Sequence, residues 1–379
     1  NVTIDGTLSN LNTLTGLVGL PTGGLFPTIT GTLTIGNHDG GFELIGLNVS
    51  GGILIHDSQG QFFVDTVSGN LTFDDTNSTG FTGHGIHIKN HKGNIVLNNA
   101  IARNNTGRGV FIENQLSGNV TIFNSAYYEN NGSHGLMIQA KGTVTLDGVH
   151  ANGNNIGIVV DTCTSLTIKN SEANNNRTAG IWVEATGKPV TLENVTANNN
   201  GDVSGMYGIH LLAVGAVNGK YIQTNSNYNT GLSIVSLGPI TLTSVSAIDN
   251  AGEGINVDST VAASTINGAL ANDNDSHGIH IETKGVILKN AVTINNESNG
   301  VYAELSGGTG VLENIQANEN GNWGIYLSSN SLGSITTKSL TAFRNEGGVS
   351  VLTQGAVTMI ATGASRNTNY EGIYISTKG

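Results

Sequence analysis

The sequence predicts an all-β solenoid, in which short parallel strands stack coil upon coil. Three observations lead to this fold class. A phrase of Gly followed by an aliphatic, any and an aliphatic residue returns at intervals of 22 to 28 residues, most often near 24. Gly accounts for 54 of 379 residues, and each Gly destabilises a helix by up to ~1 kcal/mol relative to Ala. Apolar and polar residues alternate within each phrase, as in a strand with one buried face.

We call this phrase the marker, because its Gly opens each coil of the repeat. The marker Gly residues are Gly85, Gly109, Gly135, Gly157, Gly180, Gly208, Gly231, Gly254, Gly278, Gly300, Gly324, Gly348 and Gly372. A second short strand of the Val-Thr-Leu type follows each marker, as at residues 144–146. A third, with small apolar residues, comes two residues later, as at 195–197. The sequence therefore predicts three short strands and about 24 residues per coil.

Strands of this length cannot bury enough apolar surface alone, so each coil must pack on the next at a spacing of about 4.8 Å. We expect residues 85–379 to form regular coils and residues 1–84 to form less regular coils, together making one continuous, rod-like solenoid. Within the first part, residues 52–56 resemble a marker and residues 74–83 resemble an expanded loop.

Asparagine recurs at two corners of the coil. A first column follows the second strand and contains Asn99, Asn124, Asn170, Asn194, Asn290 and Asn314. A second column consists of pairs after the third strand, at 104–105, 130–131, 154–155 and 295–296. Asn tolerates left-handed backbone, and stacked amides can hydrogen-bond from coil to coil. We predict an asparagine ladder in the first column, and in the second column either a further ladder or a set of polar turns.

The marker, the Val-Thr-Leu strands and the Asn pairs resemble the repeats of right-handed parallel β-helix proteins. These proteins are pectate-lyase-like in fold and include large bacterial surface or secreted proteins. The resemblance is closest over residues 85–379 and implies a right-handed superhelix. It does not single out a function, because the fold serves lyases, hydrolases, epimerases, phage tailspikes, adhesins and surface fibres.

Composition argues against several partners. The formal net charge is −12, and the Lys and Arg residues form no cluster, which argues against nucleic acid and anionic membrane surfaces. The sequence contains no run of about 18 apolar residues, so it predicts no membrane-spanning helix. Cys163 is the single cysteine, so an intrachain disulfide is excluded and the residue is expected to be a small apolar filler.

Residues two and four positions after each marker Gly point to the same outer side of the strand, which we call the marker face. Rings occupy many of the first positions and carboxylates many of the second. Rings that stack on sugars and carboxylates that hold hydroxyl groups are typical of saccharide-binding surfaces. The predicted ligand-binding residues are Trp182, Glu184, His280, Glu282, Tyr302, Glu304 and Tyr326.

Three carboxylates on this face, Asp258, Glu282 and Glu304, lie on successive coils beside His280. Neighbouring coils would separate carboxyl groups by about the 5–5.5 Å of a retaining glycosidase, and alternate coils by roughly the 6.5–9.5 Å of an inverting one. The same carboxylates are a candidate Ca²⁺ site. A carboxylate stripe on a solenoid is also often only solvated, where it deters aggregation. Catalysis, Ca²⁺ binding and solvation therefore remain three interpretations of this cluster.

A His between Gly or Ser and the marker Gly occurs three times, at His84, His134 and His277. The triplet is similar to the Gly/Ser-His-Gly element of polygalacturonase-type hydrolases, which also need paired aspartates such as Asp74 and Asp75. Because the triplet occurs three times at the same position of the repeat, it favours a structural preference for His at this corner of the coil over a single active site. No Arg or Lys suited to a pectate lyase accompanies the acidic face.

The sequence favours a structural or adhesive, rod-like segment of a larger extracellular or cell-surface protein or filament, with glycan contact along the marker face. The alternative is an enzyme that degrades or modifies polysaccharides at Asp258, Glu282 and Glu304, assisted by His280. The narrow range of coil lengths favours the first, because an enzyme of this fold needs long loops to form a cleft. Both ends resemble open coils, so we expect further coils or other copies there.

Overall fold

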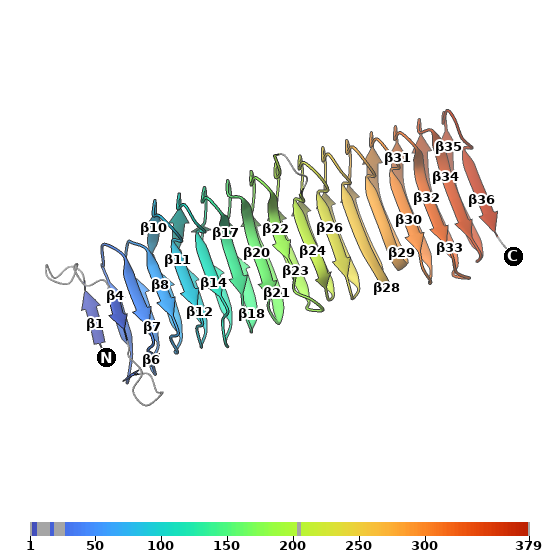
Figure 1. Cartoon of the computed structure of the whole chain (residues 1–379). Helices are drawn as coiled ribbons and strands as arrows, with labels where there is room; N and C mark the ends of the chain where they lie inside the picture. The colour runs from blue at the N-terminus through green and yellow to red at the C-terminus, as the bar shows by residue number, and fades with distance from the viewer. Residues whose placement is uncertain (1, 6–15, 19–26, 203–205, 378–379) are drawn as a thin grey trace. The chain divides into compact units, whose positions relative to one another are not determined.

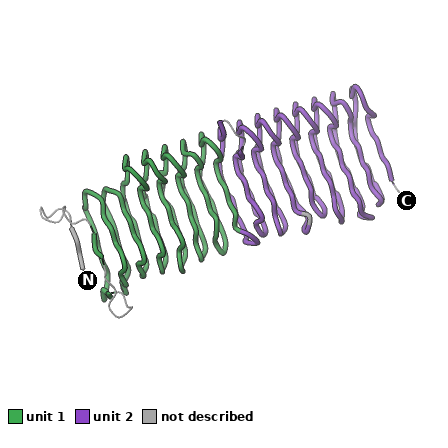
Figure 2. The backbone as a smooth tube through the Cα atoms, viewed as in Figure 1, with its two compact units in different colours: residues 1–185 green, residues 186–379 purple. Residues whose placement is uncertain are grey.

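The computed structural model describes residues 2–5, 16–18, 27–202 and 206–377. The chain divides into two compact units, residues 1–185 and 186–379 (Figure 2). All regular elements within the described residues are strands, and these residues form no helix long and apolar enough to cross a membrane. The strands pair in parallel with strands of neighbouring coils (Figure 1). The predicted all-β parallel solenoid with coils about 24 residues apart is therefore confirmed.

Unit 1, residues 1–185, contains three rows of strands. The marker row consists of β2 (Gly16–Val18), β5 (Phe42–Ile45), β8 (Phe62–Asp65), β11 (Ile86–Lys89), β14 (Val110–Glu113), β17 (His134–Gln139), β20 (Ile156–Thr162) and β22 (Ala179–Val183). The second row consists of β1 (Val2–Asp5), β4 (Leu33–Gly36), β7 (Ile53–His56), β9 (Leu71–Asp74), β12 (Ile95–Asn98), β15 (Val120–Phe123), β18 (Thr143–Asp147) and β21 (Ser165–Glu172). The third row consists of β10 (Asn77–Thr79), β13 (Ile101–Arg103), β16 (Ala126–Tyr127) and β19 (Val149–His150), and β3 (Thr28–Ile29) pairs separately with β6 (Asn48–Val49).

Unit 2, residues 186–379, repeats this plan, and its second and third strands join, as they already do in β21 of unit 1. Its marker row consists of β24 (Ile209–Val214), β26 (Leu232–Ser236), β30 (Val301–Leu305), β32 (Trp323–Ser329), β34 (Gly347–Thr353) and β36 (Ile373–Thr377). The joined strands are β23 (Val190–Thr196), β25 (Val217–Gln223), β27 (Ile240–Ser246), β31 (Gly310–Asn318), β33 (Ile335–Phe343) and β35 (Val357–Ser365), while β28 (Ile255–Leu270) and β29 (Ile279–Ile294) run through all three rows. The joint between the second and third strands is a residue with positive φ, such as Asn290 at 52°, which turns the chain without ending the strand.

Alternating side chains build the core. In β29, Ile279 and Ile281 are fully buried, whereas His280 between them points to the marker face. The register places Ile279 against Ile255 on one neighbouring strand and Val301 on the other. Each buried aliphatic side chain contributes roughly 1.5–3 kcal/mol, and that contribution requires a neighbouring coil on both sides.

The early coils differ from the expected frame. Ile53 pairs with Leu33 and Leu71 in the second row, so residues 52–56 are not a marker, contrary to the prediction. The marker strands nearby are β5 and β8. Strands of both rows alternate apolar and polar residues, and the sequence pattern alone cannot distinguish them. Strand β10 also lies inside the segment predicted to be an expanded loop, 74–83.

The predicted division of the chain at residue 84 falls partly outside the described residues, since 6–15 and 19–26 belong to its first part. That boundary, and the continuity of residues 85–379 as one solenoid, stay predictions.

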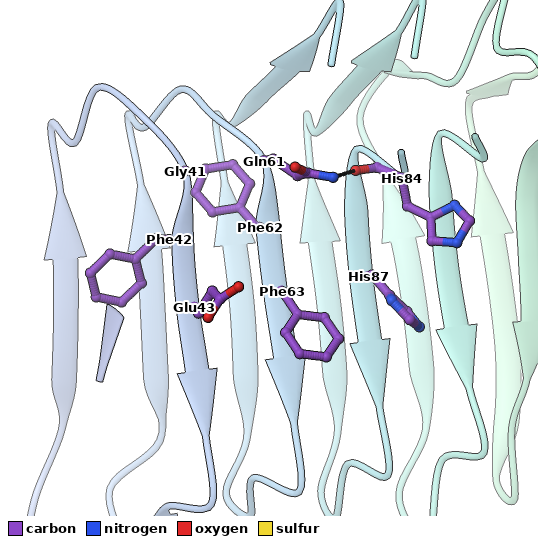
Figure 3. Close-up of a pocket in the computed structure, with 8 residues that line it drawn as sticks. All are labelled: Gly41, Phe42, Glu43, Gln61, Phe62, Phe63, His84 and His87. Atoms are coloured by element: carbon purple, nitrogen blue, oxygen red, sulfur yellow. Dashed lines mark hydrogen bonds between the residues drawn. The ribbon is translucent and has the colours of Figure 1, made fainter. Parts of the chain in front are cut away.

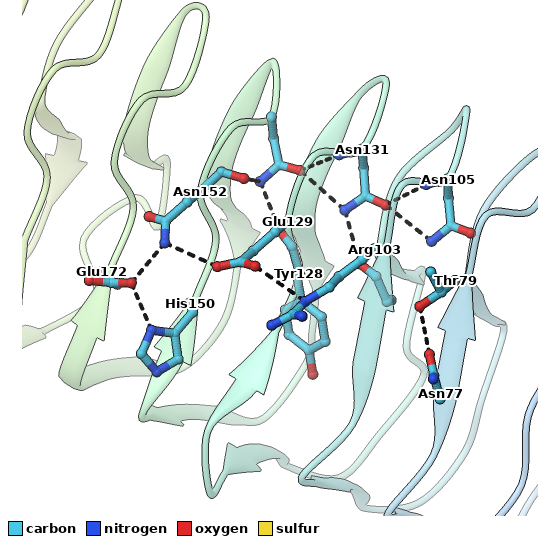
Figure 4. Close-up of polar contacts among 12 residues, drawn as sticks. Asn77, Thr79, Arg103, Asn105, Tyr128, Glu129, Asn131, His150, Asn152 and Glu172 are labelled. Carbon is cyan, nitrogen blue, oxygen red and sulfur yellow. Dashed lines mark hydrogen bonds and ion pairs between the residues drawn. The ribbon is translucent and has the colours of Figure 1, made fainter.

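A row of buried asparagines links successive coils. Asn274 shows the pattern: its backbone N–H and its Nδ2 both donate to Oδ1 of Asn296, at 3.1 and 2.9 Å. Asn296 makes the same two bonds to Asn320, and its Nδ2 also donates to the Ala271 carbonyl at 3.0 Å. Figure 4 shows the corresponding bonds of unit 1, where Asn105 donates to Asn131. Within each unit, the second asparagine column is thus the buried ladder.

The first asparagine column has a different role from the predicted ladder. Its residues adopt positive φ and lie exposed, so their side chains reach various partners on the coil before. Asn314 bonds to Asn290 at 2.8 Å, but Asn170 bonds to Asp147 and Asn124 bonds to Asn98. This column therefore supplies left-handed corners rather than a continuous ladder.

We predict that Asn296→Ala lowers the free energy of unfolding by about 2–4 kcal/mol, because it leaves the buried N–H of Asn274 and the Ala271 carbonyl without partners. Asn314→Gly is the matched control, since it removes an exposed asparagine without straining a residue at φ 56°. Urea denaturation of both variants measures the difference. Equal losses would contradict a dominant role for the buried ladder.

Candidate functional site

The marker face of unit 2 brings the predicted ligand-binding side chains together. Strands β28, β29, β30 and β32 lie side by side, with Asn256, His280, Tyr302 and Tyr326 in one row of the register. The next outward row holds Asp258, Glu282, Glu304 and Ser328. The predicted columns of rings and carboxylates are therefore confirmed over these four strands. Trp182 and Glu184 hold the corresponding positions in unit 1, on and just after β22.

Bulges interrupt the columns elsewhere. The register shifts after Leu211 so that Val214, rather than Leu212, pairs with the next strand. It also shifts after Ile138, where Gln139 pairs with Thr162. A bulge inserts an extra residue into one strand, so Leu212 and Asp161 have no direct partner in these two strand pairs, although Nε2 of Gln139 still donates to Asp161 at 3.0 Å.

Corner side chains cover part of the marker face. Phe111 is only 8% exposed, because the guanidinium of Arg108 lies 4.1 Å from the centre of its ring. His210 is 6% exposed and stacks on Tyr207 at 4.2 Å. We call the residue immediately before each marker Gly the corner residue, and both Arg108 and Tyr207 occupy that position. The outward rows are consequently less accessible than strand alternation alone predicts.

Aromatic rings in unit 2 stack on one another. His277, the corner residue before Gly278, stacks on Tyr302 at 5.0 Å, and Tyr302 stacks on Tyr326 at 5.1 Å with planes 6° apart. Tyr302 thus has neighbouring rings along the column and presents mainly its edge and hydroxyl outward. The register places Ser350, which carries no ring, beyond Tyr326. Ser350 is only 2% exposed and the indole of the corner residue Trp323 lies against Gly347, so Tyr326 ends this stack of rings and is itself half-buried.

Each ring also orients a carboxylate two residues later on the same strand. The Tyr302 hydroxyl donates to Oε1 of Glu304, and the Nε2 atom of His280 lies 3.2 Å from Oε1 of Glu282. In unit 1, Nε1 of Trp182 donates to Oε1 of Glu184 at 2.8 Å. Burial and the hydrogen bond to Glu304 raise the pKa of Tyr302 above its usual range, so this hydroxyl remains a donor. One oxygen of each carboxylate is held and the other can meet a ligand.

His280 lies between two carboxylates. Its Nδ1 is 2.5 Å from Oε1 of Glu253, the corner residue of the preceding coil, and its Nε2 faces Glu282. Burial disfavours the charged imidazolium, but the hydrogen bond and charge of Glu253, followed by Glu282, outweigh it and raise the pKa of His280 above 6.5. The pKa of His277 is lowered instead, by burial and by the charge of His280.

Sequence reasoning missed Glu253. It precedes Gly254 as His277 precedes Gly278, so the repeat frame contained the signal. Strand alternation predicts outward side chains only for residues after the marker Gly. The chain turns at the corner, however, and this turn places the Glu253 side chain over the marker face, beside His280. The His triplets lie at that corner as predicted: His84 and His277 both contact rings of the marker face.

One group of three side chains has metal-binding geometry within the described part of the chain. The ligand atoms of Glu253, His277 and His280 all lie within 4.8 Å of one another. Asp258, Glu282 and Glu304 form no such group among the described residues, although they lie on successive strands. Glu282 and Glu304 instead line a small groove of about 110 Å³ that also includes Ser306 and Ser328.

Unit 1 carries a larger groove, of about 550 Å³, whose lining includes the rings of Phe63 and His87 (Figure 3). Phe63, His87 and Phe111 lie in register on β8, β11 and β14, and the His87 ring stacks on Phe111 at 4.9 Å. Glu43 extends the row on β5. His87 and Phe111 lie two residues after the marker residues Gly85 and Gly109, whereas Phe63 and Glu43 lie before the first marker Gly, where the sequence pattern did not identify the marker strands.

A family model described as a right-handed β-helix region matches residues 51–218 and 134–314. The chain belongs to this family. Membership confirms the right-handed superhelix that the repeats indicated. No curated protein sequence matches this β-helix chain significantly.

Solved structures similar to this β-helix have low sequence identity. The A-module of the Azotobacter vinelandii mannuronan C-5 epimerase AlgE4 is 15% identical, with a TM-score of 0.38 over 92% of this chain and 91% of that one. The Dettilon tailspike protein is 12% identical, with a TM-score of 0.39 over 91% of this chain and 62% of the tailspike. PfbA, a surface adhesin of Streptococcus pneumoniae, is 12% identical, with a TM-score of 0.24 over 90% and 77%.

We predict that the pKa of His280, followed by NMR in the presence of a chelator, lies above 6.5 and falls in Glu253→Gln. Since the folded-state pKa is raised, the interaction stabilises the folded protein fully below pH 6.5 and is lost as pH rises through the folded pKa. Glu319→Gln, which removes a carboxylate paired with Arg344, is the control and should leave His280 unchanged. An unaltered His280 titration in Glu253→Gln would refute the assigned cause.

Proposed function

We propose that this β-helix is a structural or adhesive segment of a larger extracellular or cell-surface protein or filament, and that it contacts glycans through the marker face of unit 2. The contact residues are His280, Glu282, Tyr302, Glu304 and Tyr326. In unit 1, Trp182 and Glu184 provide a separate contact of the same kind. This function places the protein outside the cell or on its surface, because long polysaccharides are found there.

The pairing of rings and carboxylates carries the proposal. Each carboxylate receives a hydrogen bond from a ring donor on its own strand, so its direction is fixed before a ligand arrives. Glu282 keeps 46% of its side chain exposed, which leaves an acceptor for sugar hydroxyl groups. Tyr326 adds an apolar ring at the end of the stack. Preorganised groups of this kind bind with a smaller entropy cost than mobile surface side chains.

We predict that Tyr326→Ala weakens binding to a neutral polysaccharide about tenfold, or ~1.4 kcal/mol, through loss of the stacking ring. Tyr228→Ala is the matched control, since Tyr228 is 50% exposed and lies outside the marker face. A panel of immobilised neutral and acidic polysaccharides, with binding followed by surface plasmon resonance, measures the change. Equal affinity of the two variants for every polysaccharide would exclude this face as the binding site.

The same panel tests the alternative activity. Asp258, Glu282 and Glu304 lie on adjacent strands, the arrangement that motivated a polysaccharide-processing enzyme. New reducing or unsaturated chain ends that appear with the protein and disappear with Glu282→Gln would replace the adhesive function with an enzymatic one. The adhesive function predicts binding without such products.

We also propose that β36 pairs with a further parallel strand, from additional coils or from another copy. Ile373 and Ile375 are 44% and 45% exposed, although Val349 and Val351, their partners on β34, are fully buried. An uncovered edge of this kind favours strand addition.

We predict that the chain self-associates as its concentration rises and that Ile375→Lys reduces this association, because a charge would be buried at the new contact. Ile287→Lys, at a residue 39% exposed on the internal strand β29, is the control. Sedimentation velocity measures the oligomeric state. A chain that stays monomeric at every concentration would exclude pairing with another copy.

A further inference from the structure

Three potential metal ligands converge on the marker face of unit 2. Glu253 and His277 are corner residues of successive coils. His280 lies two residues after Gly278, the marker Gly that follows His277. One ligand atom from each lies within 4.8 Å of the other two. We propose that this cluster binds one divalent transition-metal ion of the zinc type. This inference does not depend on glycan binding.

The donor set selects the class of metal. Two imidazoles and one carboxylate are typical ligands of Zn²⁺, and three protein ligands leave a fourth position for water or a ligand group. Ca²⁺ prefers six to eight oxygen ligands, which this cluster does not offer. The site therefore differs in residues and in chemistry from the Ca²⁺ site considered for Asp258, Glu282 and Glu304.

His280 is oriented as a metal ligand. Its Nδ1 and Oε1 of Glu253, 2.5 Å apart, share a proton that a metal ion can replace. The Nε2–H then still donates to Glu282 at 3.2 Å, and a carboxylate behind a ligating His holds the ring in position. Binding releases the proton shared by Glu253 and His280 to solvent and leaves both groups bound to the metal.

His277 is held neutral, the state that metal ligation requires. The backbone N–H of Asn299 donates to Nδ1 of His277 at 3.2 Å, and Nδ2 of Asn299 lies 3.3 Å from the same atom, so the ring proton is on Nε2. Metal binding at Nε2 therefore moves this proton to Nδ1 and breaks the bond from Asn299. Oδ1 of Asn299 accepts from the Trp323 N–H, so the amide is fixed with its N–H groups toward His277. Stacking on Tyr302 immobilises the ring from another side.

Unit 1 provides an internal comparison. His84 and His87 occupy the positions of His277 and His280, with ring centres 5.1 Å apart, against 5.3 Å for the pair in unit 2. The register places Gly60 where unit 2 has Glu253, and Gly has no side chain to offer. The residues around His84 do not form a three-ligand group within the described chain. Glu253 is thus the residue that completes the site.

Isothermal titration of the full chain with Zn²⁺ tests the proposal. We expect one tight equivalent, a Kd at least tenfold higher in Glu253→Gln and in His277→Gln, and no change in the control His84→Gln. Ca²⁺ in excess should not displace the bound Zn²⁺.

Circular dichroism of each variant establishes that it is folded. Should Glu253→Gln unfold, His277→Gln gives the same readout, because it retains the bond between Glu253 and His280. Absence of a tight Zn²⁺ equivalent in the unmodified chain would overturn the proposal. Zn²⁺ binding that is equal in the unmodified chain and the folded ligand variants would overturn it as well.

Discussion

Hydrogen bonds between coils hold this protein together, because a coil contains no partner for its own strands. Within each unit, strands bond to the strands of neighbouring coils, and the register repeats except at bulges. Equivalent residues therefore lie about 4.8 Å apart along each row, and the chemistry of one coil meets its own copy in the next. Aliphatic residues gain from this arrangement by forming continuous core columns. Asparagines are stabilised as well, since each side-chain amide is both a donor and an acceptor and can bond to the equivalent asparagine of the next coil.

Charged residues cannot simply repeat, and the structure shows two ways of accommodating them. Glu313 lies between Lys289 and Lys338 on the neighbouring coils, with oxygen to nitrogen distances of 2.9 and 3.0 Å, and hydrogen bonds from both lysines lower its pKa. On the marker face, a ring donor on the same strand holds the carboxylate, as Tyr302 holds Glu304. The second arrangement fixes the carboxylates in an outward row, and the proposed glycan contact rests on this row.

The sequence predicted most of the fold from a few residue types. The marker Gly residues gave the coil length, the alternation of residues such as Ile279 and Ile281 gave the buried face, and together they placed His280, Tyr302 and Tyr326 in one row. These inferences succeed because strand alternation and a fixed repeat are local properties. They fail at residues 52–56, whose apolar pattern fits either row of strands, and at bulges, where one extra residue shifts the register.

The sequence by itself determined the parallel solenoid, its period and which side chains leave the core, since each depends on neighbours along the chain. Only the tertiary structure decided which asparagine column is buried, because the position of a corner relative to the next coil sets its exposure. It also decided that Glu253 reaches His280 from the preceding coil, 27 residues away, and that Tyr302 is stacked between other rings. The direction of a side chain at a corner depends on how the backbone turns there. The spacing of residues along the sequence does not specify that turn.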